Sequence, residues 1–189
     1  MGQYYMPIIE NEHGRTVFDR RVDGEYTMAK LMEHSYWDNP FCCAFAEKLV
    51  DTPTKVCWVG DYAEPEECED LGFTYNEVWG ESYWNNAVGV KSTDFSLDNV
   101  RYLVNETRKQ VVDLKEYKRK AILSKPRYGT INPIPLLTCL GNGRGGGDFH
   151  GSDKSTNSYV GRWAWDVIYL TNNEPPKDYR KIHPVFIEE

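Results

Sequence analysis

The segment best suited to chemistry is a glycine-rich stretch, Gly141-Asn-Gly-Arg-Gly-Gly-Gly-Asp148, which Phe149, His150 and Gly151 follow. Six of the chain's 15 glycines fall between residues 141 and 151. Such a cluster costs backbone entropy unless the chain must take positive φ or lie against another group. Its successive N–H groups could form a concave anion-binding nest, with Arg144 gripping a phosphate or carboxylate. The alternative is a flexible surface linker.

The glycine spacing matches known nucleotide-binding motifs only in part. Gly141-x-Gly143-x-x-Gly146 has the spacing of the dinucleotide fingerprint, but that motif requires a helix to begin directly afterwards. The residues from Asp148 to Ser158 are polar and turn-rich, so we exclude a Rossmann site. No Gly-Lys-Ser/Thr sequence ends the loop, which also excludes a Walker A site.

Two short segments each carry a tryptophan with an aspartate three residues later: Trp58 with Asp61, and Trp163 with Asp166. If their strands are neighbours, the two carboxylates would lie at similar heights on one sheet and could bind a metal or share acid–base roles. The alternative is that each aspartate ends a strand while its tryptophan packs in the core.

A metal-assisted hydrolase using Asp61, Asp148, His150 and Asp166 is therefore one functional hypothesis. No His-x-x-x-His, His-Glu-x-x-His or Cys/His cluster supports it, and no nucleophile elbow is present. We accordingly predict neither a metal nor another cofactor, and we favour binding over catalysis.

Charge is distributed unevenly along the chain. Residues 108–127 carry eight Lys or Arg against Asp113 and Glu116, a net charge of +6, which indicates either a solvated face or a basic rim beside an anion site. An acidic stretch at 64–70 precedes an aromatic one at 73–84 that includes Trp79 and Trp84. This 64–84 surface could instead bind a basic protein partner.

The composition is that of one globular domain spanning residues 1–189. The net charge of -7 argues against general nucleic-acid binding, and no stretch approaches the ~20 apolar residues of a membrane span. Five cysteines without a Cys-x-x-Cys pair are typical of buried side chains in a reducing compartment, so we expect a cytoplasmic protein. The composition does not predict the oligomeric state.

Elements that would position these residues follow from hydrophobic spacing and turn signals. We expect a hairpin over residues 3–18 with Gly14 at its turn, helices over 26–36 and from Pro40 to Pro53, and strands over 54–63, 159–170 and 183–188. In the 159–170 strand, Trp163, Trp165, Val167 and Tyr169 would share a face. Residues 101–114 favour a hairpin, although a helix remains open. The fold class is therefore α+β, a mainly antiparallel sheet with two or three helices packed on one side.

Several segments resemble a group of small uncharacterised bacterial and phage proteins: the Met-Gly-x-Tyr opening, Trp58-Val-Gly-Asp-Tyr-Ala63, Tyr102-Leu-Val-Asn105, the run from Asn132 into the glycine loop, and Val160-Gly-Arg-Trp-Ala-x-Asp166. Trp165 departs from that pattern, which has Gly between Ala and Asp, and so weakens a symmetric role for Asp61 and Asp166. The resemblance implies a cytoplasmic single-domain protein and brings no activity.

Our leading expectation is a protein that binds a nucleotide or another phosphorylated metabolite. The resemblance to phage proteins implies that sequestration of the ligand is the purpose of this binding. Loop amides and Arg144 would hold the anion, Trp58 or Trp163 would stack on it, and Asp148 or Asp166 would accept hydrogen bonds from it. The predicted ligand-binding residues are Asn142, Gly143, Arg144, Gly145, Gly146, Gly147, Asp148, His150, Trp58, Asp61, Trp163 and Asp166.

Overall fold

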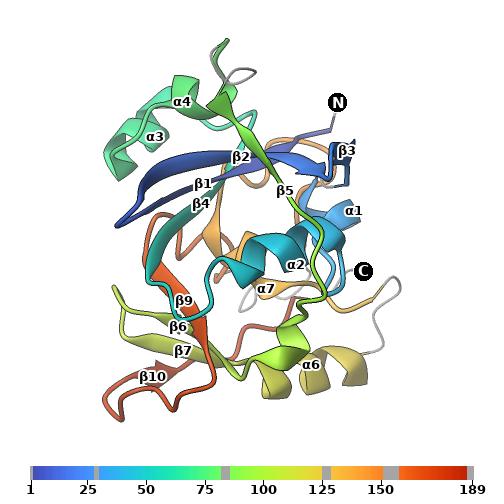
Figure 1. Cartoon of the computed structure of the whole chain (residues 1–189), viewed down its shortest axis with the longest axis vertical. Coiled ribbons are helices and arrows are strands. Elements are labelled where there is room, and N and C mark those ends of the chain that lie inside the picture. Colours follow the sequence, from blue (N-terminus) through green and yellow to red (C-terminus); the bar gives the residue numbers. More distant parts are fainter. Residues whose placement is uncertain (1, 28–29, 82–85, 125–128, 151–157, 187–189) are drawn as a thin grey trace.

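The computed structural model describes residues 2–27, 30–81, 86–124, 129–150 and 158–186, built around a central β-sheet (Figure 1). The strands are β1 (Tyr5–Asn11), β2 (Gly14–Val22), β3 (Glu25–Tyr26), β4 (Thr54–Gly60), β5 (Val88–Val90), β6 (Tyr102–Asn105), β7 (Gln110–Asp113), β8 (Cys139–Leu140), β9 (Val167–Thr171) and β10 (Arg180–Lys181). The helices are α1 (Leu31–His34), α2 (Pro40–Glu47), α3 (Pro65–Leu71), α4 (Tyr75–Trp79), α6 (Leu114–Leu123), α7 (Pro133–Thr138) and the 3-10 helix η1 (Leu97–Asn99).

The strands pair in the order β10-β7-β6-β9-β4-β1-β2-β3, while β5 pairs with β2 and β8 with β4. Pairings along the main path are antiparallel except for β10 with β7, and β5 and β8 also pair in parallel. The predicted α+β class and the mainly antiparallel sheet are thus confirmed. The described helices include none long and apolar enough to cross a membrane.

The helices cover both faces of the sheet, so the expectation that they pack on one side needs correction. Side chains of β1 point alternately to two separate apolar clusters: Tyr5 and Ile9 to a larger one shared with α2 and α7, Met6 and Ile8 to a smaller one shared with α3 and α4. Figure 1 shows α3 and α4 above β1 and β2, with α2 and α7 below. Because both faces of β1 are apolar, both require a covering layer.

The first hairpin and the second helix form where the sequence predicts them. β1 pairs with β2 from Ile8–Val17 to Asn11–Gly14, and Gly14 takes the positive φ of 105° that the turn requires. The Asn39 side chain caps α2 by accepting from the N–H groups of Phe41 and Cys42, and Pro40 occupies the first turn. This helix ends at Glu47 rather than near Pro53.

Residues 101–113 form the hairpin that the sequence favours, and a helix begins directly after it at Leu114. β6 and β7 form the predicted hairpin, and Asp113 then caps α6 by accepting from the N–H of Glu116. The short strands bury Leu103, Val104, Val111 and Val112, whereas the following segment of strong helix formers continues as a helix.

Three predicted elements are shorter than expected. The helix expected over residues 26–36 is reduced to α1, and Tyr26 belongs to β3 instead. Residues 158–165 form turns, so β9 begins at Val167, and residues 183–186 form no strand. The turn gives Trp165 a positive φ of 63° and sends Trp163 and Trp165 to different apolar clusters, so they do not share a face.

Candidate functional site

The glycine loop wraps around one of its own side chains. Asp148 is 1% exposed, and its Oδ2 accepts from the backbone N–H groups of Gly143, Arg144 and Gly145 at 2.7, 2.8 and 2.9 Å. Its Oδ1 accepts from the buried Tyr5 hydroxyl at 2.7 Å. Burial, with contributions from Cys139 and the Asp148 carboxylate, raises the pKa of Tyr5 and keeps that hydroxyl a donor. The loop amides do form an anion nest, but the anion in it is Asp148.

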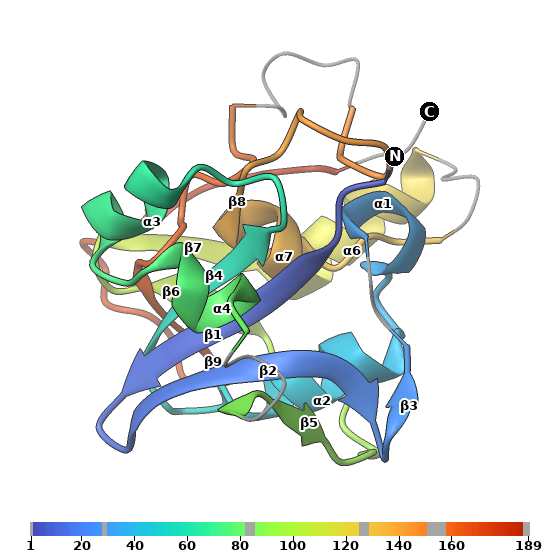
Figure 2. The ribbon, with the colours of Figure 1, turned by 90° about the horizontal axis from the view of Figure 1, so that it is seen from above.

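Hydrogen bonds and ring packing fix the loop against itself and against the rest of the chain. Asn142 and Phe149 exchange two hydrogen bonds, and Phe149 packs edge-on against Phe186 in the main cluster. Gln3 donates its N–H to the carbonyl of Gly146, so the segment that leads into β1 runs beside the loop (Figure 2). A Cβ on Gly145 would lie 2.6 Å from the Gln3 Cβ, which is why this position requires glycine. The flexible-linker alternative is therefore excluded for residues 141–150.

The Arg144 guanidinium also has an internal partner. It donates to both carboxylate oxygens of Glu67 in α3, at 2.7 and 2.6 Å, and to the Tyr62 carbonyl at 2.9 Å. This hydrogen bonding is the main reason that the pKa of Glu67 lies below its ordinary value. Arg144 thus joins the glycine loop to α3, and an external anion would have to displace Glu67.

The two tryptophans predicted to stack on a ligand do not face the loop. Trp58 and Trp163 are fully buried, Trp58 against the edges of Phe41 and Phe45, so neither presents a face to a ligand. Trp163 donates its indole N–H to Gln110 at 2.9 Å. His150 and Gly146 are exposed, and Gly147 lies against Lys30. The structure gives the two tryptophans core positions, the alternative that the sequence had left open.

Asp61 and Asp166 do not form a carboxylate pair. The strands are antiparallel, the N–H of Val56 donates to the Asp166 carbonyl, and Asp61 lies five residues beyond Val56, roughly 16 Å further along the sheet. Asp166 accepts from Asn105 and from Arg108, while Asp61 accepts from the Tyr4 N–H. In the described part of the chain, no three His, Cys, Asp or Glu side chains are placed to hold a metal ion. The paired-carboxylate hypothesis fails because the sheet separates its members.

The aromatic residues of the 64–84 surface mostly face the sheet. Phe73 is buried against Trp165, the Tyr75 hydroxyl donates to the Asp61 carbonyl, and the Trp79 indole donates to the Val59 carbonyl. The acidic side chains of Glu66 and neighbouring α3 residues remain exposed. Trp84 lies outside the described residues. Recognition of a basic partner by this surface stays a prediction.

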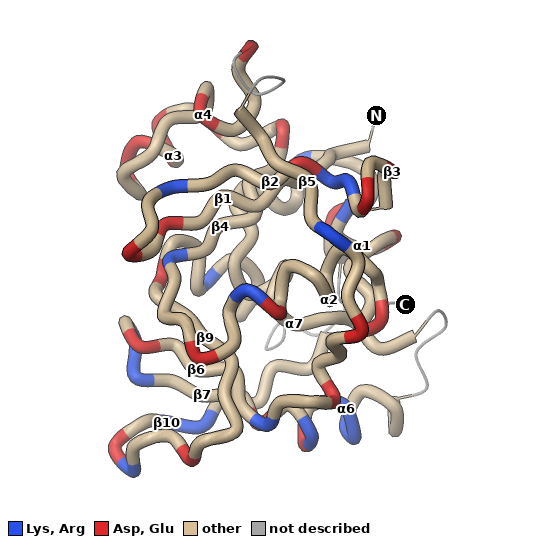
Figure 3. Tube along the Cα trace, viewed as in Figure 1, with Lys and Arg blue, Asp and Glu red and all other residues tan. Residues whose placement is uncertain are grey.

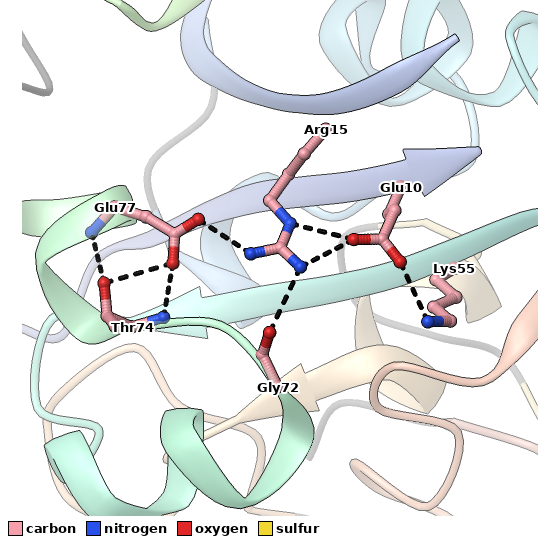
Figure 4. A network of polar contacts seen from close by, with 6 residues as sticks. All are labelled: Glu10, Arg15, Lys55, Gly72, Thr74 and Glu77. Carbon is pink, nitrogen blue, oxygen red and sulfur yellow. Dashed lines mark hydrogen bonds and ion pairs between the residues drawn. The ribbon is translucent and has the colours of Figure 1, made fainter. Parts of the chain in front are cut away.

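A polar network holds α3 and α4 on the sheet (Figure 4). Arg15 in β2 donates to Glu10 Oε2 at 3.0 and 2.6 Å, to Glu77 Oε1 at 2.7 Å and to the Gly72 carbonyl at 3.1 Å. Lys55 donates to the second oxygen of Glu10 at 2.8 Å. Sequence reasoning missed this network because its members are distant along the chain and individually look like ordinary surface charges.

A cavity of about 610 Å³ lies beside α6, and no residue of the glycine loop lines it. Its apolar lining comes from two elements and two residues outside them: Leu97 of η1, Leu114, Ile122 and Leu123 of α6, and Trp37 and Val100. Leu97, Leu114 and Val100 are buried, whereas Ile122 and Leu123 are exposed. The volume falls in the range of small-molecule binding sites. Apolar walls with a few polar groups are also typical of such sites.

The rim of this cavity is basic. Lys118 donates to both oxygens of Asp98 and lies 5.2 Å above the Trp37 ring, and Arg101 pairs with Asp113. Lys115 and Arg119 are exposed at helical i, i+4 spacing, and no carboxylate among the described residues pairs with either. Figure 3 shows Lys and Arg recurring along α6. The basic segment noted in the sequence therefore borders an apolar cavity, although not the glycine loop.

No protein-family model matches the chain, and neither a curated protein nor a solved structure is significantly similar to it. The resemblance to bacterial and phage proteins thus stays a prediction. The functional argument depends on the chain's own geometry.

Proposed function

We propose that this protein binds a small organic anion with an apolar body, in the cavity beside α6. A small anionic ligand is also what the sequence predicts, but the proposed site moves from the glycine loop to the helix. The move follows from the internal ligands of the loop, since Asp148 fills its amide nest and Glu67 occupies Arg144.

The observation that carries the proposal is an apolar cavity bordered by unpaired cations on an acidic protein. The cavity lining includes four basic residues and one acidic residue, a local excess of +3, while the whole chain has a net charge of -7. Apolar walls would bury the body of the ligand, and Lys115 with Arg119 would attract its charged group. Because both cations are exposed, each contributes modestly, about 0.5–1 kcal/mol.

The proposal is tested with two fluorescent probes, anionic anilinonaphthalene sulfonate and uncharged N-phenylnaphthylamine. We expect both to bind the native protein, and we expect Lys115→Gln with Arg119→Gln to weaken sulfonate binding roughly tenfold, from the combined loss of about 1–2 kcal/mol. The neutral probe should be unaffected. Lys177→Gln with Arg180→Gln, two exposed cations outside the cavity lining, is the matched control.

Competition then identifies the ligand class. Displacement of the sulfonate probe by adenosine monophosphate supports the nucleotide expectation, whereas displacement by decanoate alone supports an aliphatic acid. Equal sulfonate binding by the native protein and the Lys115/Arg119 variant would refute the assignment of the site.

A further inference from the structure

Arg20 of β2 is enclosed by aromatic rings from three separate segments. Its guanidinium carbon lies 5.4 Å from the ring centre of Tyr4, 5.6 Å from that of Tyr26 in β3, and 5.7 Å from that of Trp79 in α4. Each distance is within the ~6 Å range of a cation–π contact. The three contacts place the guanidinium among aromatic rings that cannot neutralise its charge.

Among the residues that the structure describes, no carboxylate forms an ion pair with this arginine, in contrast to others nearby. Arg15 pairs with Glu10 and Glu77, and Arg21 pairs with Asp19. Arg20 makes no side-chain hydrogen bond or ion pair within the described ranges, and its Nε is buried without a partner.

The charge of Arg20 acts on the carboxylate of Asp61, but Asp61 accepts its hydrogen bond from another group. Its Oδ1 accepts from the Tyr4 N–H at 3.0 Å. Burial raises the pKa of Asp61, and the charge of Arg20 offsets only part of that rise. Arg20 therefore lies among three rings and, within the described part of the chain, forms no ion pair with a carboxylate, so its charge is available to an external anion.

The surroundings indicate a macromolecular ligand. Tyr26 is 59% exposed and Tyr4 is 39% exposed, so a free anion at Arg20 would remain largely hydrated. A solvent-exposed ion pair of this kind strengthens binding only several-fold. Useful affinity requires a ligand that also covers the tyrosine faces, and Tyr, Trp and Arg are the residues that dominate protein interfaces.

We propose that Arg20, Tyr4, Tyr26 and Trp79 form a docking point for a protein partner that presents one carboxylate flanked by apolar side chains. The guanidinium would bind the carboxylate through two parallel hydrogen bonds, and the tyrosine rings would pack on the flanking groups. The chain's net charge of -7 repels a strongly acidic segment, so a single carboxylate is favoured over an acidic run. This site is separate from the α6 cavity and does not depend on the proposed function.

The probe is a random dodecapeptide library displayed on phage and selected on the full-length protein. We expect enriched peptides to share an Asp or Glu between apolar residues, and synthetic copies to lose at least tenfold in affinity when that residue becomes Asn or Gln. Arg20→Gln should cause a similar loss. Tyr26→Ala should weaken binding several-fold, because this ring is the most exposed of the three.

Arg20→Lys keeps the charge but lacks the planar fork, so it should bind more weakly than the native protein and better than Arg20→Gln. It also keeps the test valid if Arg20→Gln fails to fold, which circular dichroism would reveal. Arg162→Gln, at an exposed arginine in the turns of residues 158–165, is the matched control. Enriched peptides without a carboxylate, unchanged binding by the Arg20 variants, or no enrichment over the Arg20→Gln protein would each overturn the proposal. Enrichment of peptides with several consecutive acidic residues would also overturn the proposal, because it requires a single carboxylate between apolar residues.

Discussion

Replacing Asp148 with alanine should destabilise the protein strongly, because four donors lose one acceptor group. The Tyr5 hydroxyl is fully buried and would be left unpaired, at a cost of roughly 1–3 kcal/mol. The three loop amides are partly exposed and regain water, so each adds about 0.5–1 kcal/mol. The sum is about 2.5–6 kcal/mol, a large part of the ~5–15 kcal/mol stability of a typical domain.

Urea unfolding followed by tryptophan fluorescence measures this loss. Tyr5→Phe is the matched variant, since it removes one donor and leaves the nest intact, and it should cost about 1.5–3 kcal/mol. Asp148→Ala also empties the nest, so sodium acetate should raise its urea midpoint above that in sodium chloride of equal ionic strength. The native protein should show no such difference.

A loss below about 1 kcal/mol for Asp148→Ala would refute the structural role of the nest, since that is less than one unpaired buried hydroxyl costs. Acetate stabilising the native protein as much as the variant would show that the loop binds anions beside Asp148. That result would return the anion site to the glycine loop and contradict our placement of it at α6.

Two further predictions concern the charge networks. Arg15→Ala should lower the free energy of unfolding by about 1–2 kcal/mol, because its partly exposed ion pairs and its hydrogen bond to Gly72 hold α3 and α4 on the sheet. Arg180→Ala is the control. Equal urea midpoints for the two variants would contradict this prediction. Hydrogen bonds from Arg144 to Glu67, and from Lys55 and Arg15 to Glu10, lower the pKa of each carboxyl below 4.5. Their stabilisation is therefore complete above about pH 4.5 and is lost as the pH falls through the lowered values. The urea midpoint should fall on acidification, and less steeply in Arg144→Gln; a parallel fall in both proteins would argue against the Glu67 contribution.

Much of the fold follows from local sequence signals. Asn39 and Pro40 fix the start of α2, Gly14 fixes the first turn, and the β-branched residues of β6 and β7 favour the hairpin over a helix. These predictions succeed because capping, positive φ and χ1 restriction act within a few residues.

The predicted strand at 159–170 fails because a non-local contact overrides its pattern. Gly161 and Trp163 donate their N–H groups to Leu136 and Leu137, and Trp165 donates to Val56. These bonds hold the segment in turns and place its two tryptophans on opposite sides of the sheet. Alternation of aromatic residues alone cannot reveal partners that lie more than 20 residues away.

The sequence by itself indicated two alternatives for residues 141–148, an anion nest or a flexible linker, because clustered glycines free the amides to converge but do not supply the anion. Only the tertiary structure decided that the charge is Asp148, with the hydroxyl of Tyr5, 143 residues away in the sequence, as its fourth donor. The same division applies to α6, whose basic character is visible in the sequence, while its apolar cavity exists only where η1, Trp37 and the helix meet. Backbone freedom and charge are local properties, whereas the partner that satisfies them depends on how the chain packs.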